Sequence, residues 1–285
     1  MSSGAPDPFD RQRLIPWWHQ AAVEAAKVAV VGVGGTGCTF AVQAARTGVG
    51  ELHLFDNDVV EASNLNRQFL YSPRDVGRPK ARAAAEALRD RHVVGPTRVV
   101  AHQTDVLEDW RRVVDVLARC DLVFNALDLP EVKRLPVASA CLKFGVPTIF
   151  AGTDPHGGNS GVVLYQPSKP GAPCYECLQA VLAGVPEEVR RALSPSNVVV
   201  AAKFDLNFLH GSPWPPPGAP PGATRAATCA STAALVTSFA TSLATRVLHG
   251  LVDGLPHRLL VDAYNYEVEA YALDPRPDCY LCGPS

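Results

Sequence analysis

Short apolar runs alternate with longer amphipathic segments through the first half of the chain. The runs are rich in Val, Leu, Ile and Phe, as in strands buried on both faces of a parallel sheet. The pattern predicts strands at 28–31, 52–55, 98–102, 122–126 and 147–151, and helices at 21–26, 38–46, 81–90, 106–118 and 131–144. Strands that alternate with helices of this length predict an α/β fold with a doubly wound, mostly parallel Rossmann-like sheet.

The pattern changes after residue 152. Runs at 161–165, 258–263 and 266–273 predict an antiparallel C-terminal extension of the sheet, and 230–249 predicts a long helix. Residues 211–223 are rich in proline and glycine and cannot hold a regular helix or strand. They form either a crossover loop above a ligand site or a surface insertion without a role, and composition does not separate the two.

The first predicted strand runs into a glycine-rich turn, Gly32-Val33-Gly34-Gly35-Thr36-Gly37, which precedes a helix. Such a turn presents backbone N–H groups and the positive end of a helix to phosphates. Asp56, at the tip of the second strand, is placed to accept hydrogen bonds from ribose hydroxyls. By itself this fingerprint indicates a nucleotide and favours a dinucleotide oxidoreductase.

A polar stretch after the second strand goes beyond what a dinucleotide needs. Asn64, Arg67 and Gln68 follow the strand, and Lys80 comes a little later. Arg67 and Lys80 supply fixed positive charge, while Asn64 and Gln68 supply oriented dipoles. This set suits a triphosphate, whose charge must be neutralised and held in line for attack. The alternative is a solvated loop with ordinary charges.

Asp128 follows the fourth predicted strand, so it should share one rim of the sheet with Asp56. A carboxylate beside a triphosphate needs a bridging cation, and we therefore expect Mg²⁺ on Asp128. Lys133 and Arg134, about one helical turn further on, are interpreted as a solvated helix face, with contact to a substrate as the alternative.

Two C-x-x-C pairs predict a closed zinc site. Two pairs of thiolates complete a tetrahedral sulfur site, which makes a structural zinc knuckle and pins the C-terminus to the sheet. The four ligands would be Cys174, Cys177, Cys279 and Cys282. A redox dithiol is the alternative. Small apolar fillers of the core are the interpretation for Cys38, Cys120 and Cys141.

Composition narrows the functional classes. The chain has 285 residues, 47% of them apolar, enough for a sizeable core, and a net charge of -2. With a pI near 6.4 there is no footprint for bulk nucleic-acid binding. No signal peptide is visible, and the uncharged stretch 226–245 is interpreted as a buried helix rather than a membrane span. Eight cysteines without a secretory signal predict a reducing, cytoplasmic location.

Several motifs together resemble the ThiF/MoeB/HesA family of adenylyltransferases, which includes the ubiquitin-activating enzymes. The segments GVGGTG, DNDVVEASNLNRQFL, DVGRPK and DLVFNALD are similar to that family's motifs, as are Arg11-Gln12 and the two C-x-x-C pairs. The resemblance covers essentially the whole chain. The combination is specific, although no single motif is.

The resemblance implies an enzyme that uses ATP to adenylate the C-terminal carboxylate of a ubiquitin-like or sulfur-carrier protein ending in glycine, with release of pyrophosphate. It implies a homodimer in which Arg11 reaches the partner's nucleotide site. The alternative for Arg11 is a surface helix whose tryptophans, Trp17 and Trp18, cap the core. We expect one domain over 1–285, in which 27–152 binds the nucleotide and 153–285 grips the carrier tail. The implied ATP-binding residues are Gly35, Asp56, Ser63, Asn64, Arg67, Gln68, Lys80 and Asp128.

Cys229 precedes the helix at 230–249, whose N-terminus would stabilise a thiolate. Some relatives use a thiol at the matching place to take the activated acyl group or sulfur, and others work without it. The alternative is a buried or capping cysteine. Leu129 departs from the family pattern, in which a polar residue follows the aspartate, and this leaves the ribose and adenine contacts open.

Three other functions stay open at this stage. A NAD-dependent oxidoreductase explains the glycine turn and Asp56 but leaves Arg67, Lys80 and Asp128 without a role. A scaffold that has lost catalysis is disfavoured, because every charged residue that the chemistry needs is present. Within the adenylating enzymes, the carboxylate could instead belong to a peptide or a modified tRNA.

Overall fold

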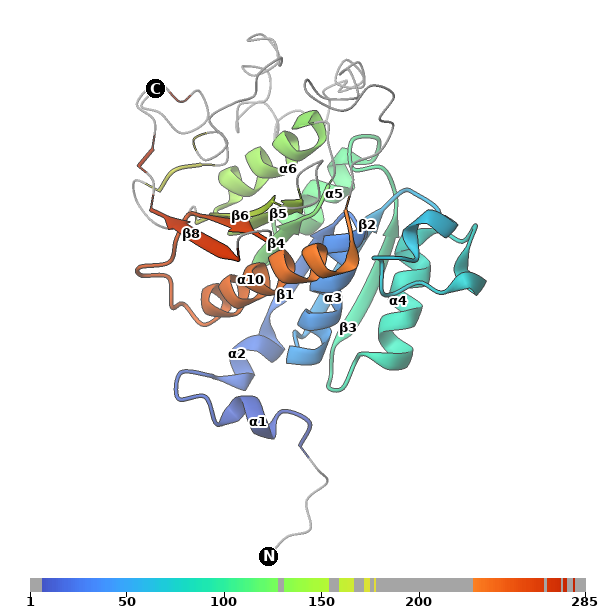
Figure 1. Cartoon of the computed structure of the whole chain (residues 1–285), viewed down its shortest axis with the longest axis horizontal. Helices are drawn as coiled ribbons and strands as arrows, with labels where there is room; N and C mark the ends of the chain where they lie inside the picture. The colour runs from blue at the N-terminus through green and yellow to red at the C-terminus, as the bar shows by residue number, and fades with distance from the viewer. Residues whose placement is uncertain are drawn as a thin grey trace, which may run out of the picture.

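The alternating apolar runs form one sheet. The computed structural model describes residues 7–127, 131–153, 159–166, 172–174, 177, 228–263, 266–272, 274–275 and 279. In these parts of the chain eight strands pair in the order β3-β2-β1-β4-β5-β6-β7-β8 (Figure 1). The strands are β1 Lys27–Val31, β2 Glu51–Asp56, β3 Arg98–Gln103, β4 Leu122–Asn125, β5 Thr148–Thr153, β6 Asn159–Tyr165, β7 Arg258–Asp262 and β8 Glu267–Tyr271.

The first five strands are parallel, and β6, β7 and β8 continue the sheet antiparallel. The order reverses beside β1, because β2 pairs on one side of it and β4 on the other. Ligands of doubly wound sheets bind outside the carboxyl ends of the strands at such a switch point. The prediction of a doubly wound, mostly parallel sheet with an antiparallel C-terminal extension is confirmed.

Helices cover both faces of the sheet (Figure 1). On one face α3, α4 and α10 pack, and on the other α5 and α6. The helices are α1 Asp10–Arg13, α2 Gln20–Ala25, α3 Gly35–Thr47, α4 Lys80–Arg91, α5 Trp110–Leu117, α6 Glu131–Phe144 and α10 Ala230–Leu248, with short 3-10 turns η1 Ala62–Asn64 and η2 Pro73–Asp75.

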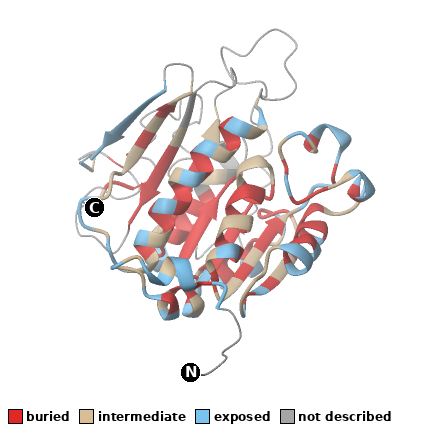
Figure 2. Ribbon diagram, turned by 60° about the horizontal axis from the view of Figure 1, so that its bottom comes forward, coloured by how far each residue is buried: buried red, intermediate tan, exposed pale blue. Residues whose placement is uncertain are grey.

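Alternation along each strand builds the two cores. In β4, Leu122 and Phe124 face the α3 side, whereas Val123 faces the α5 side. Phe40 of α3 stacks on Phe124 with ring centroids 4.1 Å apart. Burying one such side chain contributes about 1.5–3 kcal/mol, so the two clusters hold the sheet rigid beneath its edges. Figure 2 shows buried residues along the central strands and the inward sides of the helices.

Many boundaries differ from the sequence prediction by one or two residues, and two helix starts differ by more. Helix α3 begins at Gly35 rather than at residue 38, inside the glycine run, because Gly37 packs against the Gly32 carbonyl where no side chain would fit. Helix α5 begins at Trp110 rather than at 106, since the Asp105 carboxylate accepts the Leu107 N–H at 2.8 Å and holds a turn there.

The last strand begins at Glu267 rather than at 266. Tyr266 has a φ of +58°, a left-handed conformation that a strand residue does not adopt. Pro136 lies inside α6. The proline-rich stretch 211–223 and residues 264–265, between the last two strands, lie outside the described residues.

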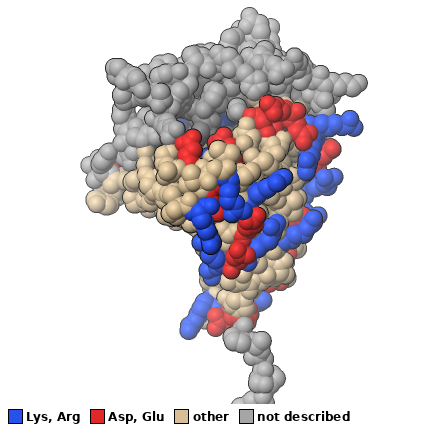
Figure 3. All heavy atoms as spheres, turned by 90° about the vertical axis from the view of Figure 1, so that its right-hand side faces the viewer, with Lys and Arg blue, Asp and Glu red and all other residues tan. Residues whose placement is uncertain are grey.

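Helix α10 is the buried helix predicted from 226–245. Its inward residues, among them Val236 and Ala240, are fully buried against α3 and the sheet. No helix in the described ranges has both the length and the apolar character needed to cross a membrane. On the side of the molecule formed by α4 and the segment before it, basic and acidic side chains are interspersed (Figure 3).

Candidate active site

The glycine turn between β1 and α3 needs two of its glycines for packing and keeps two others open. Gly32 has a φ of +91°, and a Cβ there would lie 2.8 Å from the Ala126 carbonyl oxygen. A Cβ at Gly37 would lie 2.0 Å from the Gly32 carbonyl oxygen. At Gly34 and Gly35 the nearest atoms would be 3.9 and 3.6 Å away, so packing does not require glycine there. These open positions let a phosphate approach the backbone.

Asp56, the last residue of β2, binds the glycine turn directly. One carboxylate oxygen accepts the Val33 N–H at 2.7 Å, and the other accepts the Asp58 N–H at 2.8 Å. Burial raises the pKa of Asp56, and the positive charge of Lys80 opposes the shift. Each oxygen keeps a further lone pair, so it can also accept a hydroxyl. Asp56 lies where the sequence predicts, and its contact with ribose stays a prediction.

The 57–79 segment folds back on itself and delivers Lys80 to the same edge. Val59 and Pro79 form an antiparallel bridge. Lys80 begins α4 with its side chain only 9% exposed, and its Nζ donates to the Asp58 carboxylate at 3.0 Å. The predicted cation is therefore held by an acid to which sequence reasoning assigned no role. The Asp-x-Asp spacing with Asp56 was the available signal.

Arg67 and Gln68 lie against the glycine turn. Side-chain carbons of Arg67 would be 3.6 Å from a Cβ on Gly35, and Gln68 Nε2 would be 3.9 Å from one on Gly34. The Arg67 guanidinium donates to the Ser63 carbonyl at 2.8 Å. Gln68 is buried, and within the described residues its Oε1 has no hydrogen-bond partner. An orphaned acceptor beside an open turn fits a ligand that donates a hydrogen bond.

Ser63 and Asn64 lie in η1, and both bind Glu61. The buried Asn64 side chain accepts the Glu61 N–H at 3.0 Å, and the exposed Ser63 hydroxyl donates to the Glu61 carboxylate at 2.9 Å. In this structure Asn64 supports the loop that carries Arg67. The direct contact of Ser63 and Asn64 with ATP stays a prediction.

Asp128 lies outside the described residues, but the end of β4 just before it is described. Ala126 N–H donates to the Val31 carbonyl at 2.8 Å, which places this strand end beside the glycine turn. The guanidinium of Arg134 donates to the Leu127 carbonyl, and its side chain is half-buried. The interpretation of Arg134 as part of a solvated face is therefore wrong, because the guanidinium satisfies a backbone carbonyl at the strand end.

Cys229 reaches the same edge from the far end of the sequence. It precedes α10 as the N-cap residue, and Ala233 in the first turn would be 3.7 Å from a Cβ on Gly35. The exposed Sγ lies 3.1 Å from the Ser231 hydroxyl and 3.2 Å from that of Thr232. These two hydroxyls lower the pKa of Cys229 to about 7. This accessible thiol, at the end of α10 that approaches the glycine turn through Ala233, is thus about half thiolate near pH 7.

Arg11 lies at the opposite edge. It is exposed on α1, and the neighbouring Gln12 donates to the carbonyl of Thr47, the last residue of α3. The glycine turn is at the first residue of α3. A helix of that length, Gly35–Thr47, separates its ends by about 20 Å, so Arg11 does not reach the turn of its own chain. Action in the site of a second copy stays a prediction.

Three of the four predicted zinc ligands converge. Cys174 Sγ lies 3.8 Å from Cys177 Sγ and 3.5 Å from Cys279 Sγ, and all three thiols are buried. A tetrahedral ion with sulfur ligands at about 2.3 Å separates the sulfurs by about 3.8 Å. The spacing fits a shared ion and is too long for a disulfide. Cys282 lies outside the described residues, whereas Cys38, Cys120 and Cys141 are buried as predicted.

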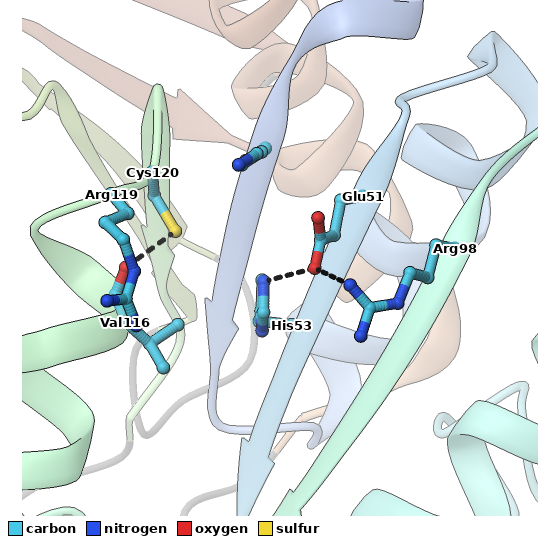
Figure 4. A pocket seen from close by; sticks show the side chains of 7 residues that line it. Glu51, His53, Arg98, Val116, Arg119 and Cys120 are labelled. Atoms are coloured by element: carbon cyan, nitrogen blue, oxygen red, sulfur yellow. Dashed lines mark hydrogen bonds and ion pairs between the residues drawn. The ribbon is translucent and has the colours of Figure 1, made fainter.

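A shallow pocket of about 270 Å³ lies at the amino edge, and its network was not predicted. Figure 4 shows Glu51 between His53 and Arg98, at 3.0 and 2.9 Å. His53 Nδ1 in turn lies 3.0 Å from His102 Nε2. Burial lowers the pKa of both imidazoles, that of His102 to about 4, so they are neutral at pH 7. The contact depends on how β2 and β3 align, which the sequence pattern does not specify.

Fold and edge geometry define a doubly wound α/β protein with a glycine turn and two cations, Arg67 and Lys80, at the carboxyl ends of its strands. The chain belongs to the ThiF family, whose family model matches residues 9–281.

Named relatives match part of the chain. It is 38% identical over 173 residues to the Mus musculus "Adenylyltransferase and sulfurtransferase MOCS3", a match covering 60% of this chain and 36% of that protein. It is 35% identical over 177 residues to the Emericella nidulans "Adenylyltransferase and sulfurtransferase uba4", with the same shares. The aligned region thus spans about a third of the length of these curated relatives.

Solved structures share the fold. Escherichia coli MccB with MccA-N7isoASN has a TM-score of 0.73 at 22% identity, covering 98% of this chain and 76% of that one. PaaA has a TM-score of 0.66 at 21% identity, covering 94% and 84%. At this level of identity the likeness is one of architecture.

Proposed function

We propose that this chain uses ATP to adenylate a carboxylate. The observation that carries the proposal is the gathering of an open glycine turn, a strand-end carboxylate and two cations, Arg67 and Lys80, at one edge of the sheet. Neutralising and aligning a polyphosphate is most of what such a reaction asks of a protein. The names of the MOCS3 and uba4 relatives support the same chemistry.

In the proposed reaction a carboxylate oxygen attacks the α-phosphorus of ATP. A new bond forms between that oxygen and the phosphorus, the bond from the α-phosphorus to the bridging oxygen breaks, and pyrophosphate leaves with the electron pair. The carboxylate is already ionised at neutral pH, so no side-chain base is required. Arg67 and Lys80 stabilise the charge on the phosphates, and Asp56 holds the ribose.

Two further contributions complete the proposed site. Asp128 would hold Mg²⁺, which when bound neutralises phosphate charge. Arg11 would come from a second copy in a homodimer, because its own glycine turn is a helix length away. Both assignments rest on the family to which the chain belongs. The place of Asp128 in the sequence, shortly after β4, and the exposure of Arg11 on α1 support them.

The proposed substrate is the C-terminal glycine carboxylate of a small ubiquitin-like or sulfur-carrier protein, held by residues 153–285. The word sulfurtransferase in the relatives' names supports a sulfur carrier. A peptide is the alternative, since structures of the MccB neighbour include MccA, and a tRNA-linked carboxylate is a third choice.

Cys229 supports a second step. Its thiolate would attack the carbonyl of the acyl-adenylate, form a thioester and release AMP. Alternatively, it would accept the outer sulfur of a donor persulfide, whose own thiolate leaves, and so carry sulfur as a persulfide. The lowered pKa of Cys229 and its place four residues before Ala233, the α10 residue that lies against Gly35, favour this role over a capping one. Neither a thioester nor a persulfide is required for adenylation itself.

We also propose that Cys174, Cys177, Cys279 and Cys282 hold a structural zinc. When bound, the ion supplies folding stability and leaves no open coordination position for catalysis. Reduced thiols at this spacing support a cytoplasmic location.

The test is isotope exchange between pyrophosphate and ATP, with candidate carrier proteins, peptides and modified tRNAs that carry a free carboxylate supplied one at a time. Exchange that requires one carboxylate substrate, and is lost when its terminal carboxylate is amidated, supports the proposal. ATP-independent turnover of NADH would replace it with the oxidoreductase. Absence of both ATP binding and exchange would leave the scaffold as the conclusion.

A further inference from the structure

Tyr71 is buried beneath the glycine turn and has no role in the site described so far. Only 7% of the residue is exposed. Its hydroxyl lies 2.9 Å from the Val33 carbonyl oxygen and 3.4 Å from that of Lys80. One phenol therefore contacts both the turn between β1 and α3 and the first residue of α4. These two segments carry the proposed phosphate donors and the proposed cation.

The peptide after Val33 is fixed through its carbonyl. The Tyr71 hydroxyl donates to it at 2.9 Å, and the Cys38 thiol donates to it at 3.3 Å. In a planar trans peptide the carbonyl and the next N–H point in opposite directions. Drawing the Val33 oxygen into the protein therefore turns the Gly34 N–H outward. Among the described residues this N–H has no hydrogen-bond partner.

The preceding peptide is fixed as well. Val33 N–H donates to Asp56 at 2.7 Å, so Val33 is held on both sides of its Cα. Lys80 is held at three points, its backbone N–H and Nζ by Asp58 and its carbonyl by Tyr71. The hydroxyl of Tyr71 is the group that touches both the turn and the start of α4.

A hydroxyl at this place needs an explanation. Burial raises the pKa of Tyr71 well above its ordinary value, so the phenol stays protonated and acts as a donor. Phenylalanine would fill the same space without a polar group to satisfy, and a buried hydroxyl is unfavourable unless it is hydrogen-bonded. Both acceptors within its reach belong to the proposed phosphate site.

We propose that Tyr71 is a positioning residue. Its hydroxyl sets the direction of the Gly34 N–H and the distance between that N–H and the Lys80 cation. In this way it determines how tightly the site binds the polyphosphate of a nucleotide. This proposal rests on the function proposed above. Tyr71 does not touch the ligand.

The experiment compares Tyr71→Phe with Tyr165→Phe, which removes a different buried hydroxyl from the far end of β6. The readouts are the ATP dissociation constant by calorimetry, the KM and maximal rate of pyrophosphate exchange, and the melting temperature. Misplacing a bound group by about 1 Å costs on the order of a hundredfold in rate, so we expect Tyr71→Phe to lower kcat/KM by about 10- to 100-fold. Its melting temperature should fall no further than that of Tyr165→Phe.

Replacing Tyr71 by 4-aminophenylalanine, which keeps a donor at the same place, should restore most of the ATP affinity. Equal ATP affinity in Tyr71→Phe and Tyr165→Phe, or failure of the donor-bearing residue to rescue it, overturns the proposal. If Tyr71→Phe does not fold, Cys38→Ala removes the other donor to the same carbonyl. It should weaken ATP binding in the same direction by a smaller factor, and an unchanged affinity overturns the proposal.

The two proposals fail in different ways. If wild-type protein binds ATP but exchanges no pyrophosphate with any carboxylate, the adenylation reaction is wrong, and the calorimetric comparison still decides the role of Tyr71. If exchange occurs and ATP affinity does not depend on the phenol, only the role of Tyr71 is wrong.

Discussion

Polar side chains at the amino ends and at the carboxyl ends of the strands have different hydrogen-bond partners. At the amino edge they bind one another: Glu51 pairs with both His53 and Arg98, and His53 contacts His102. At the carboxyl edge Lys80 also pairs with a side chain, the Asp58 carboxylate, but the groups around the glycine turn bind backbone instead. The Asp56 carboxylate accepts two N–H groups, and the Tyr71 hydroxyl donates to carbonyls.

This difference in partners indicates at which edge a ligand can bind without breaking bonds that stabilise the fold. Side chains that are already paired with one another, as Glu51 is with His53 and Arg98, have less to offer a ligand, and breaking such pairs costs free energy. A frame that uses carbonyls and strand-end carboxylates to fix a turn leaves other backbone N–H groups unbound, and these are ready to receive an anion. The carboxyl edge is of this second kind, which is why the proposed chemistry belongs there.

The largest effect is expected from removing charge at the carboxyl edge. Lys80→Ala and Asp128→Ala should each lower the rate of pyrophosphate exchange by about 10²–10³-fold, because stabilisation of transition-state charge is lost. The fold should survive, since the partner left behind, Asp58, is 65% exposed. Circular dichroism and the melting temperature check this point.

Arg98→Ala is the matched control at the amino edge. Its side chain is 71% exposed, and such ion pairs contribute little. Pyrophosphate exchange at the wild-type rate in both Lys80→Ala and Asp128→Ala would contradict the assignment of these residues to the active site. An equally large loss in Arg98→Ala would break the contrast between the edges.

A second prediction links the two edges through a dimer. If Arg11 acts in the partner's site, Arg11→Ala and Lys80→Ala should each be nearly inactive alone. Refolded together in equal amounts they should recover about a quarter of wild-type exchange, because half of the dimers are mixed and each has one complete site. Arg13→Ala, two residues away on the same helix, is the control. No recovery on mixing means that Arg11 does not act across a dimer.

A third prediction concerns stability rather than catalysis. Purified protein should contain about one zinc per chain, and Cys174→Ser should lose the metal and melt at a lower temperature. Cys141→Ala, a buried thiol in the same apolar cluster, should keep the metal. Zinc content is measured by mass spectrometry of the metal. A metal-free wild-type protein, or full zinc in Cys174→Ser, contradicts the assignment.

The smallest effect on exchange is expected at Cys229. Cys229→Ala should leave adenylation and zinc content unchanged and abolish only a thiol-sensitive covalent adduct formed with ATP and carrier. With its pKa lowered to about 7, the thiolate fraction should rise as pH increases through 7. An ordinary thiol shows this rise near pH 8.5. Alkylation rates of the Cys229 peptide measure it.

The buried thiols provide the internal comparison for Cys229. Burial raises the pKa of Cys38, Cys120 and Cys141 to about 12, so they should react far more slowly at every pH tested. If an adduct persists in Cys229→Ala, or forms in neither protein, Cys229 is a structural residue.

Local pattern predicted the parts of the site that lie at strand ends. The glycine turn, Asp56 and Lys80 each follow an apolar run or begin a helix, and the rule for parallel sheets places strand ends on one rim. The doubly wound, mostly parallel sheet follows from the same alternation of strands and helices. These features are local in sequence, so one sequence suffices to find them.

The remaining features depend on contacts between distant segments. Hydrophobic periodicity does not specify how two strands align or where two segments cross. The hydrogen bonds of Tyr71, the contact of His53 with His102 and the bond from Arg134 to a carbonyl all depend on such alignments. Predicted helix boundaries were wrong where a tertiary contact outweighed the intrinsic helix propensity of the residues. Helix α3 includes glycines that disfavour helix, because close packing against the turn offsets their cost.

Strand β8 ends the sheet within the described part of the chain, and all five of its residues are exposed. An open strand edge is a template on which other chains can add and aggregate. Glu267 and Glu269 place carboxylates along this edge, so a second copy approaching in the same way meets like charge. This like charge should keep the β8 edges of neighbouring molecules apart in dilute buffer, and high salt, which screens charge, should weaken that protection against aggregation.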